Sequence, residues 1–366
     1  METASPCASG VSCDRREEAA GDALSIYSLD KLKRGVHRRA ILLLGLYKTM
    51  RVKDEVSIRP FGMSDAKPVT RLLRQSWDHD PKMLMVYGLH RVWPTDTSLI
   101  RQSLVATVGG EVVGAATLVE DTFHPKMLWA TINVSPSWQR RGTGSALYEA
   151  LRSLADGRPW MVKLTLRDRA GTAFLEKRGF YSPRGRGIMG VLDPREELVQ
   201  RWLEHLPRNV AGYAFLPLDD SDNPATLKDV ARVQALVYRQ YHSWNPPIDE
   251  PLDRALAHYC GSGVLTGSHL CVFEGETLVG AANVFRHPPE GDGDEAYLAH
   301  IGVVGRKRPQ VRELTAALIR RTVEWAGVAG YRVRFEADEE YAPHLVVYQT
   351  APADEVDRDF AIYINA

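Results

Sequence analysis

Several features that mark specialised protein classes are scarce or missing in this sequence. Four of its 366 residues are cysteines (Cys7, Cys13, Cys260 and Cys271), and they form neither a CxxC pair nor a regularly spaced set. A disulfide framework is therefore not indicated, and a reducing compartment is expected. The longest apolar run, residues 40–47, is far shorter than the roughly 18–20 residues that a membrane-spanning helix needs.

Charge and targeting signals are equally uninformative. The formal net charge is zero at pH 7, which gives no support to a nucleic-acid or membrane-surface partner. The first residues lack the basic and apolar segments of a secretory signal. The chain has no nucleophile elbow, no Walker loop, no HExxH and no regular set of metal ligands. We therefore expect a cytoplasmic protein with no metal, no membrane contact and no nucleic-acid partner.

The composition is that of a globular protein, with 44% hydrophobic and 25% charged residues. The length favours two domains. Residues 1–22 are small and polar, as in disordered segments, and residues 24–49 have the periodicity of a basic helix. This extension, residues 1–55, either packs on the main body, which we favour, or contacts a membrane or partner; Met50 is an alternative start.

Alternating strand and helix patterns follow from residue 56 onward. A strand at 56–60 precedes a helix at 65–77, for which Ser64 or Asp65 is the expected cap. Gly109 and Gly110 predict a hairpin turn between two strands. The remaining predicted elements of this first domain, residues 56–193, are strands at 104–108, 112–120, 128–134, 161–166 and 188–192 and helices at 145–155 and 171–177.

The pattern then begins again after a charged linker helix at 194–212. Residues 214–218, 275–282 and 299–303 resemble residues 57–61, 110–116 and 130–134, in the same order and at similar offsets. Three ordered similarities of this kind indicate that a whole domain is duplicated. The second copy spans residues 213–366.

One segment carries a recognisable chemistry. Gly142 and Gly144 stand one residue apart between the predicted strand at 128–134 and the helix that follows. Glycines allow the backbone to turn here, and the unpaired N–H groups and dipole of the helix start then favour an anion such as a pyrophosphate. Arg140 and Arg141 add positive charge.

In context, Val-x-Pro-x-Trp-Gln-Arg-Arg-Gly-x-Gly-x-x-Leu from Val134 resembles the acyl-CoA signature of the GNAT superfamily of N-acyltransferases, Q/R-x-x-G-x-G/A. Residues 173–180, which end in a Gly-Phe step, resemble the second signature of that family. The resemblance covers residues 56–192 well and 213–366 loosely. It implies an α/β fold of two tandem GNAT domains, each with a mixed, mostly antiparallel central sheet flanked by helices.

The resemblance also implies a co-substrate and a reaction. Acetyl-CoA or another short acyl-CoA would bind between two splayed strands, and an amine would attack the thioester directly, without an acyl-enzyme. The residues implied in cofactor binding are Ile132, Asn133, Val134, Gln139, Arg140, Arg141, Gly142, Thr143, Gly144, Ser145, Phe174 and Lys177.

The implied acceptor is a small-molecule amine. Tandem-GNAT proteins include mycothiol synthases and antibiotic-pathway proteins, which suggests a role in antibiotic or other secondary metabolism. Two alternatives are a protein N-acetyltransferase and a non-catalytic acyl-CoA binding or scaffold protein.

The groups that move protons are not evident. Leu175 stands where family members often have the tyrosine that protonates the leaving thiolate. Tyr148 is a candidate substitute, with core packing as its alternative role. Glu120 and His124, at the end of the preceding strand, are candidates for the general base, with a solvated loop as the alternative.

The second copy departs further from the pattern. Aligning its helix with the first places Glu313 and Thr315 over Gly142 and Gly144. A carboxylate would then stand where the pyrophosphate binds, so we expect the second copy not to bind CoA in the standard way. It would complete the acceptor pocket or support the first domain. The aromatic loop at 241–247 either lines a pocket or packs within the second domain.

Overall fold

The computed structural model describes residues 56–77, 101–120, 124–182, 186–248, 251–261, 263–286, 293–353 and 360–365. The predicted extension at 1–55, including its helix, lies outside these residues. None of the described helices is long and apolar enough to cross a membrane.

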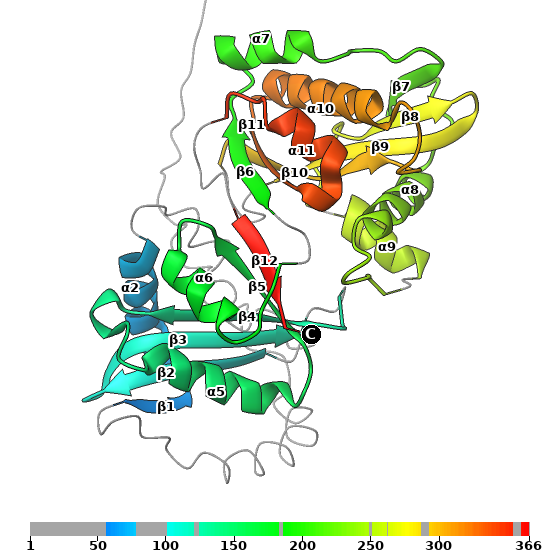
Figure 1. The fold of residues 1–366 in the computed structure, drawn as a ribbon. Coiled ribbons are helices and arrows are strands. Elements are labelled where there is room, and N and C mark those ends of the chain that lie inside the picture. Colours follow the sequence, from blue (N-terminus) through cyan, green and yellow to red (C-terminus); the bar gives the residue numbers. More distant parts are fainter. Residues whose placement is uncertain are drawn as a thin grey trace, which may run out of the picture. The chain divides into compact units, whose positions relative to one another are not determined.

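The described strands form one twelve-stranded sheet in the order β1-β2-β3-β4-β5-β12-β6-β11-β10-β9-β8-β7 (Figure 1). The strands are β1 (Ser57–Pro60), β2 (Arg101–Val108), β3 (Glu111–Glu120), β4 (Leu128–Val134), β5 (Trp160–Thr165), β6 (Gly187–Leu192), β7 (Tyr213–Pro217), β8 (Leu270–Glu274), β9 (Thr277–Arg286), β10 (Glu295–Val303), β11 (Arg332–Asp338) and β12 (Phe360–Ile364). The helices are α2 (Ala66–Trp77), α5 (Thr143–Ala155), α6 (Arg169–Glu176), α7 (Glu197–His205), α8 (Leu227–Gln240), α9 (Leu252–Cys260), α10 (Val311–Val328) and α11 (Ala342–Tyr348), with short 3-10 turns η1 (Met63–Asp65), η2 (Pro136–Trp138) and η3 (Glu339–Tyr341).

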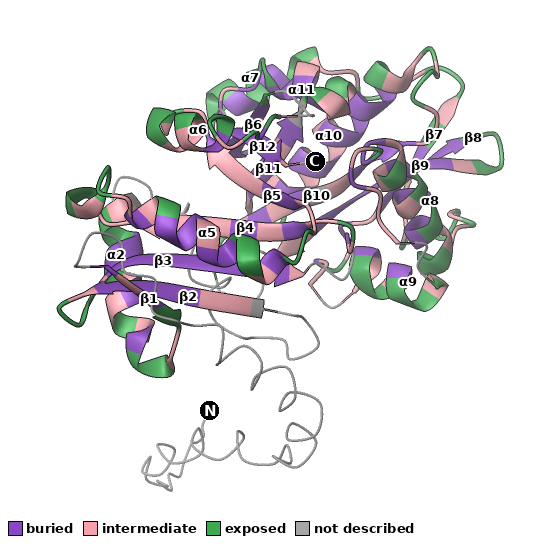
Figure 2. Ribbon diagram, turned by 60° about the horizontal axis from the view of Figure 1, so that its bottom comes forward, coloured by how far each residue is buried: buried purple, intermediate pink, exposed green. Residues whose placement is uncertain are grey.

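Helices cover both faces of the sheet because successive strand residues point to opposite sides. In β3, Ala115 packs with the α2 residues Leu72 and Leu73, whereas a Cβ at Gly114 would lie 3.0 Å from Leu147 of α5. The second half repeats this arrangement, with Ala281 of β9 packed against α8 and Ala282 against α10. The buried residues of the strands lie between these two helix layers (Figure 2).

The strand order supports the predicted duplication. If β1 is exchanged with β7, β2 with β8 and so on to β6 with β12, the new order read from the opposite edge is the same as the original order. The three similar sequence segments fall on matching elements, namely β1 and β7, the β2–β3 and β8–β9 hairpins, and β4 and β10. The mixed α/β fold with tandem GNAT-type halves is therefore as the sequence predicts.

The two halves exchange their last strands. β12, from the end of the chain, pairs with β5 over five positions from Phe360↔Thr165 to Ile364↔Met161. β6, from the end of the predicted first domain, pairs with β11 over six positions. Figure 1 shows β12 between β5 and β6. Residues from Arg51 onward cluster as one compact unit, so strand pairing crosses the predicted boundary at 193–213, and the domain bounds remain a prediction.

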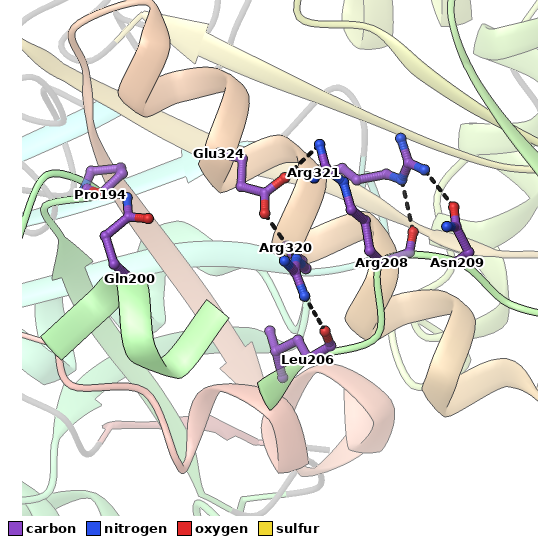
Figure 3. A network of polar contacts seen from close by, with 8 residues as sticks. All are labelled: Pro194, Gln200, Leu206, Arg208, Asn209, Arg320, Arg321 and Glu324. Atoms are coloured by element: carbon purple, nitrogen blue, oxygen red, sulfur yellow. Dashed lines mark hydrogen bonds and ion pairs between the residues drawn. The ribbon is translucent and has the colours of Figure 1, made fainter. Parts of the chain in front are cut away.

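The linker between the halves is fixed to α10. Arg320 Nη1 donates to the carbonyl of Leu206 at 2.6 Å, and Arg321 Nη2 donates to Asn209 Oδ1 at 2.7 Å (Figure 3). A Cβ on Gly327 would lie 2.7 Å from Cβ of Pro194, so α10 and the linker are in close contact. The predicted helix at 194–212 is confined to α7, and the remaining residues form turns, bends and irregular backbone.

Local expectations differ from the structure mainly at element ends. The strand at 128–134 has the predicted bounds, and the Gly109-Gly110 turn has positive φ at both residues, as hairpin turns of this kind require. Neither Ser64 nor Asp65 begins the first helix. Instead, Asp65 accepts from the backbone N–H of Gly62 in η1, and its ion pair with Arg59 lowers the pKa of its carboxyl.

We expect the centre of the sheet to be sensitive to side-chain volume at Gly187. A Cβ there would lie 2.1 Å from the Phe360 ring. Gly187→Ala should therefore destabilise the protein by about 1–3 kcal/mol through overpacking, as measured by urea unfolding. In a Phe360→Ala background the ring is absent, so the same change should cost much less. Additive effects of the two substitutions would contradict the strand exchange.

Candidate functional site

β4 and β5 separate shortly after they begin. These parallel strands pair only at Leu128↔Trp160 and Trp129↔Met161, although β4 continues to Val134 and β5 to Thr165. The far edge of β5 is held by β12 along its length. A gap therefore opens between β4 and β5 while both strands stay in the sheet.

This gap contains a pocket of about 320 Å³. We call it the β4–β5 passage because consecutive strand residues line it, and consecutive side chains point to opposite faces of a sheet. It thus connects the α5/α6 face with the α2 face. The lining residues are Ser76, Ala130, Thr131, Ile132, Asn133, Val134, Gln139, Val162, Lys163, Leu164, Thr165, Arg167 and Asp168.

The glycine motif forms the turn that joins β4 to α5. Gly142, with φ of 91°, is the N-cap of α5, and Arg140 also has positive φ, at 61°. The first turn of α5 contains no acidic residue. The N–H groups at the start of a helix have no intrahelical acceptor, so this end of α5 presents donors and positive potential to an anion.

Side chains of the motif fix this turn. Gln139 Nε2 donates to the carbonyl of Val134 at 3.2 Å. Thr143 is fully buried. A Cβ on Gly144 would contact Phe174 at 3.4 Å and Val134 at 3.7 Å, which leaves little room for a larger residue.

Arg178 is a positive group near this turn that the sequence analysis did not single out. Its Nη2 donates to Ser145 Oγ at 2.8 Å, and its guanidinium lies 3.5 Å from the centre of the Phe174 ring. Arg178 therefore joins the end of α6 to the start of α5. Lys177 is exposed.

The three candidate catalytic side chains do not line the passage. Glu120 pairs with Arg158 at 2.9 Å. His124 is buried, with Nδ1 2.7 Å from the carbonyl oxygen of Asn245 and Nε2 2.8 Å from the Tyr238 hydroxyl. Both contacts of His124 are to the second half, through α8 and the loop after it.

Tyr148 has a packing role. Its ring lies among aromatic side chains, 5.1 Å from Trp160 between ring centres, 6.2 Å from Phe174 and 6.4 Å from Phe180. It occupies the side of α5 that faces the core, so its hydroxyl is not placed to serve the passage. Glu120, His124 and Tyr148 thus lie outside the lining of the passage, and their catalytic roles stay predictions.

Polar residues that the sequence analysis did not select do line the passage. Ser76 comes from α2, Lys163 and Thr165 come from β5, and Asp168 caps α6 by accepting from the Gly171 N–H at 2.8 Å. The sequence could have indicated the β5 residues. The expected notch lies between β4 and β5, but binding residues were assigned on β4 alone. Ser76 had no such signal, since its proximity depends on tertiary packing.

The corresponding notch in the second half is filled. β10 and β11 pair from Glu295↔Arg332 to Leu298↔Phe335 and then separate, but the space beside His300, Ile301 and Gly302 is only about 10 Å³. A Cβ on Gly302 would lie 2.5 Å from Cγ1 of Val237 in α8. In the second half, α8 therefore lies directly against β10.

The turn before α10 differs as well. Gln310 is the N-cap of α10, with φ of −95°, so it occupies the place of Gly142. Glu313 consequently lies three residues inside the helix, and the sequence alignment that placed it over Gly142 is shifted. Its carboxylate still stands in the first turn, where it opposes the binding of an anion.

Among the residues that the structure describes, no group of three or more His, Cys, Asp or Glu side chains is placed to hold a metal ion. Cys260 and Cys271 are free thiols, and burial raises the pKa of both.

Comparison with known proteins agrees with this geometry. Residues 100–182 match the acetyltransferase (GNAT) domain family. A GCN5-related N-acetyltransferase from Sphaerobacter thermophilus has a similar structure, with a TM-score of 0.61, 14% identity, and coverage of 86% of this chain and 96% of that chain. A tandem GNAT protein from the clavulanic acid biosynthesis pathway has a TM-score of 0.53 and 19% identity, with 85% and 98% covered. No curated protein matches the sequence.

The fold, the splayed strands and the family match define a GNAT domain in the first half of the chain. Beyond residues 100–182, the likeness to the tandem GNAT structure shows the fold, in which two similar halves share one sheet.

The histidines buried near the second notch should make the free energy of unfolding depend on pH. Burial lowers the pKa of His300 from 6.5 to about 3 and that of His344 from 6.5 to about 4. Each histidine therefore stabilises the fold fully above about pH 6.5, and this contribution is lost as the pH falls toward the lowered values. The loss should be about 1.4 kcal/mol per pH unit for each histidine.

Urea unfolding at about pH 7 and pH 5 measures this effect, and His344→Leu should reduce the slope of stability against pH by about 1.4 kcal/mol per pH unit. An unchanged slope in that variant would show that His344 is not buried in its neutral form.

Proposed function

We propose that this protein transfers an acetyl or other short acyl group from acyl-CoA to an amine of a small molecule, by direct attack on the thioester. The observation that carries the proposal is the β4–β5 passage, which connects an anion-binding helix start on one face with an open route to the other face. An acyl donor and an acceptor can thereby meet from opposite sides of the sheet.

The first half fits the pyrophosphate of CoA. The turn from Gln139 to Ser145 combines two backbone positions with positive φ, free donors at the start of α5 and the positive charges of Arg140 and Arg141. Ile132, Asn133 and Val134 would border the pantetheine arm along the β4 edge, whose backbone is not paired with β5 there. Phe174 closes the space above Gly144.

When bound, acyl-CoA supplies an activated thioester. Its thiolate leaves readily because a thiol has a pKa of about 8.5. The protein's main contribution is then alignment of the amine with the acyl carbon. Thr131 and Asn133 are neutral hydrogen-bonding groups on the passage wall that can orient the thioester or a water molecule. The amine loses its proton as the C–N bond forms, the C–S bond breaks, and water in the passage carries the proton away.

We assign catalysis to residues 56–193 and a supporting role to residues 213–366. The second notch is too small for a pantetheine arm, and Glu313 opposes an anion at α10. The loop after α8 instead reaches the first half, where Asn245 Nδ2 lies 3.4 Å from Met161 Sδ. We place the reaction in the cytoplasm and in secondary metabolism, with support from the likeness to the clavulanic acid pathway protein.

Substitution at Gly142 tests the cofactor assignment. Gly142→Glu should abolish binding of acetyl-CoA in a calorimetric titration, because a carboxylate would stand at the pyrophosphate position and repel it. Gly157→Glu is the matched control, since Gly157 also has positive φ, at 77°, with no neighbour within 4 Å of a Cβ. Both variants carry a similar backbone strain of about 1–2 kcal/mol, so only the first should lose binding.

The same titration counts the sites. We expect one acetyl-CoA per chain, because one notch is open and the other is filled. Two equivalent sites would contradict the supporting role of the second half. If Gly142→Glu binds as the unmodified protein does, the pyrophosphate assignment is wrong. Consumption of the thioester that does not depend on any added amine would favour an acyl-CoA binding or scaffold protein.

A further inference from the structure

An ion pair at the centre of the sheet joins the two halves. Lys163 of β5 donates from Nζ to Oε2 of Glu336 in β11 at 2.5 Å, and its ammonium lies 4.2 Å from the centre of the Phe360 ring. Thr165 pairs with the first residue of β12, and Asp338 pairs with the first residue of β6. Lys163 lies two residues before Thr165, and Glu336 lies two residues before Asp338. The two positions are therefore equivalent in the duplication, and one carries a cation while the other carries an anion.

This pair is on the α2 face of the sheet. Trp160 packs against Tyr148 of α5, and the Leu164 side chain approaches Gly171 of α6. Because strand side chains alternate, Lys163 points to the opposite face. Ser76 of α2 and Lys163 both border the passage, and Glu336 reaches it through its contact with Lys163.

The carboxylate is the more accessible member of the pair. Its side chain is 25% exposed, whereas that of Lys163 is 8% exposed. A second pair, Arg334 with Glu295, is more deeply buried, with 5% and 14% exposed. Glu336 Oε1 accepts no hydrogen bond from any residue that the structure describes. A molecule that arrives on this face thus meets a fixed, partly exposed negative charge whose geometry is set by Lys163.

We infer that Glu336, positioned by Lys163, binds a second cationic group of the acceptor, which makes the preferred acceptor a diamine or larger polyamine. This inference rests on the proposed acyl transfer. In the proposed reaction the thioester lies in the gap between β4 and β5, and the side chains of Lys163 and Glu336 meet over β12 and β6, the two strands between β5 and β11. With neighbouring strands about 4.8 Å apart, the carboxylate is about 10 Å from the gap. It is therefore suited to an ammonium remote from the reacting nitrogen.

Three acceptors of equal length test the inference: hexamethylenediamine, hexylamine and aminocaproate, whose remote ends are positive, neutral and negative. With acetyl-CoA as donor, we expect kcat/KM to fall in that order. Glu336→Gln should lower the value for the diamine by about tenfold or more, the scale of a lost charge-assisted hydrogen bond. It should leave hexylamine nearly unchanged and improve aminocaproate. Glu336→Asp should keep the order with a smaller ratio.

Two further variants guard against a folding defect. Lys163→Gln with Glu336→Gln removes both charges without leaving a buried ammonium unpaired, and it should also lose the preference for the diamine. Glu324→Gln is a matched control, because Glu324 has a similar exposed fraction of 27% and pairs with Arg320 on α10. This control should keep the order of acceptors.

The outcomes separate this inference from the proposed function. Equal losses for all three acceptors, or no change in their order, would overturn the role of Glu336 while leaving acyl transfer intact. Failure of the unmodified protein to bind acetyl-CoA would instead overturn the proposed function. If turnover is slow, binding of hexamethylenediamine to the CoA-loaded protein, weakened by Glu336→Gln, supports the inference, and equal binding refutes it.

Discussion

The pairing of β5 with β12 is the interaction on which the site depends. β5 shares only two paired positions with β4, so most of its backbone groups on that side are available to line a passage. A strand with both edges unpaired would leave buried donors and acceptors unsatisfied, at a cost of about 1–3 kcal/mol each. β12 satisfies the other edge over five positions. The open notch of the first half therefore requires the last strand of the second half.

The two halves share one architecture, but the notch of the first half is open and that of the second is filled. A few residues at the helix start and beside the strand account for the difference. In the first half, Gly142 gives the turn before α5 a conformation that exposes N–H donors, and no carboxylate opposes an anion there. In the second half, Gln310 begins α10 and Glu313 stands in its first turn, while Val237 fills the space over Gly302. A duplicated fold can thus lose one binding site through a few side chains, because the sheet and its helices are stabilised independently of the ligand.

The sequence predicts features whose cause is local. β4 has the expected bounds because its alternation and the flanking Pro136 are visible in the chain, and the duplication is visible because matching segments recur. The strand exchange has no local signal, since β12 would read as the same strand whichever edge it joined. Tyr148, Glu120 and His124 were chosen by chain proximity to the motif, but core packing, Arg158 and the second half determine where their side chains lie. The ion pair of Lys163 with Glu336 has no local signal, because its two members come from different halves.

The ion pair between Lys163 and Glu336 gives the duplication a functional meaning. In a symmetric ancestor both positions would carry the same residue, and two like charges this close would repel. Opposite charges allow the exchanged strands to meet at the centre, and they fix a carboxylate of the second half against Lys163, which lines the passage of the first. With the proposed role of Glu336, the second half would contribute to acceptor specificity without binding the cofactor itself.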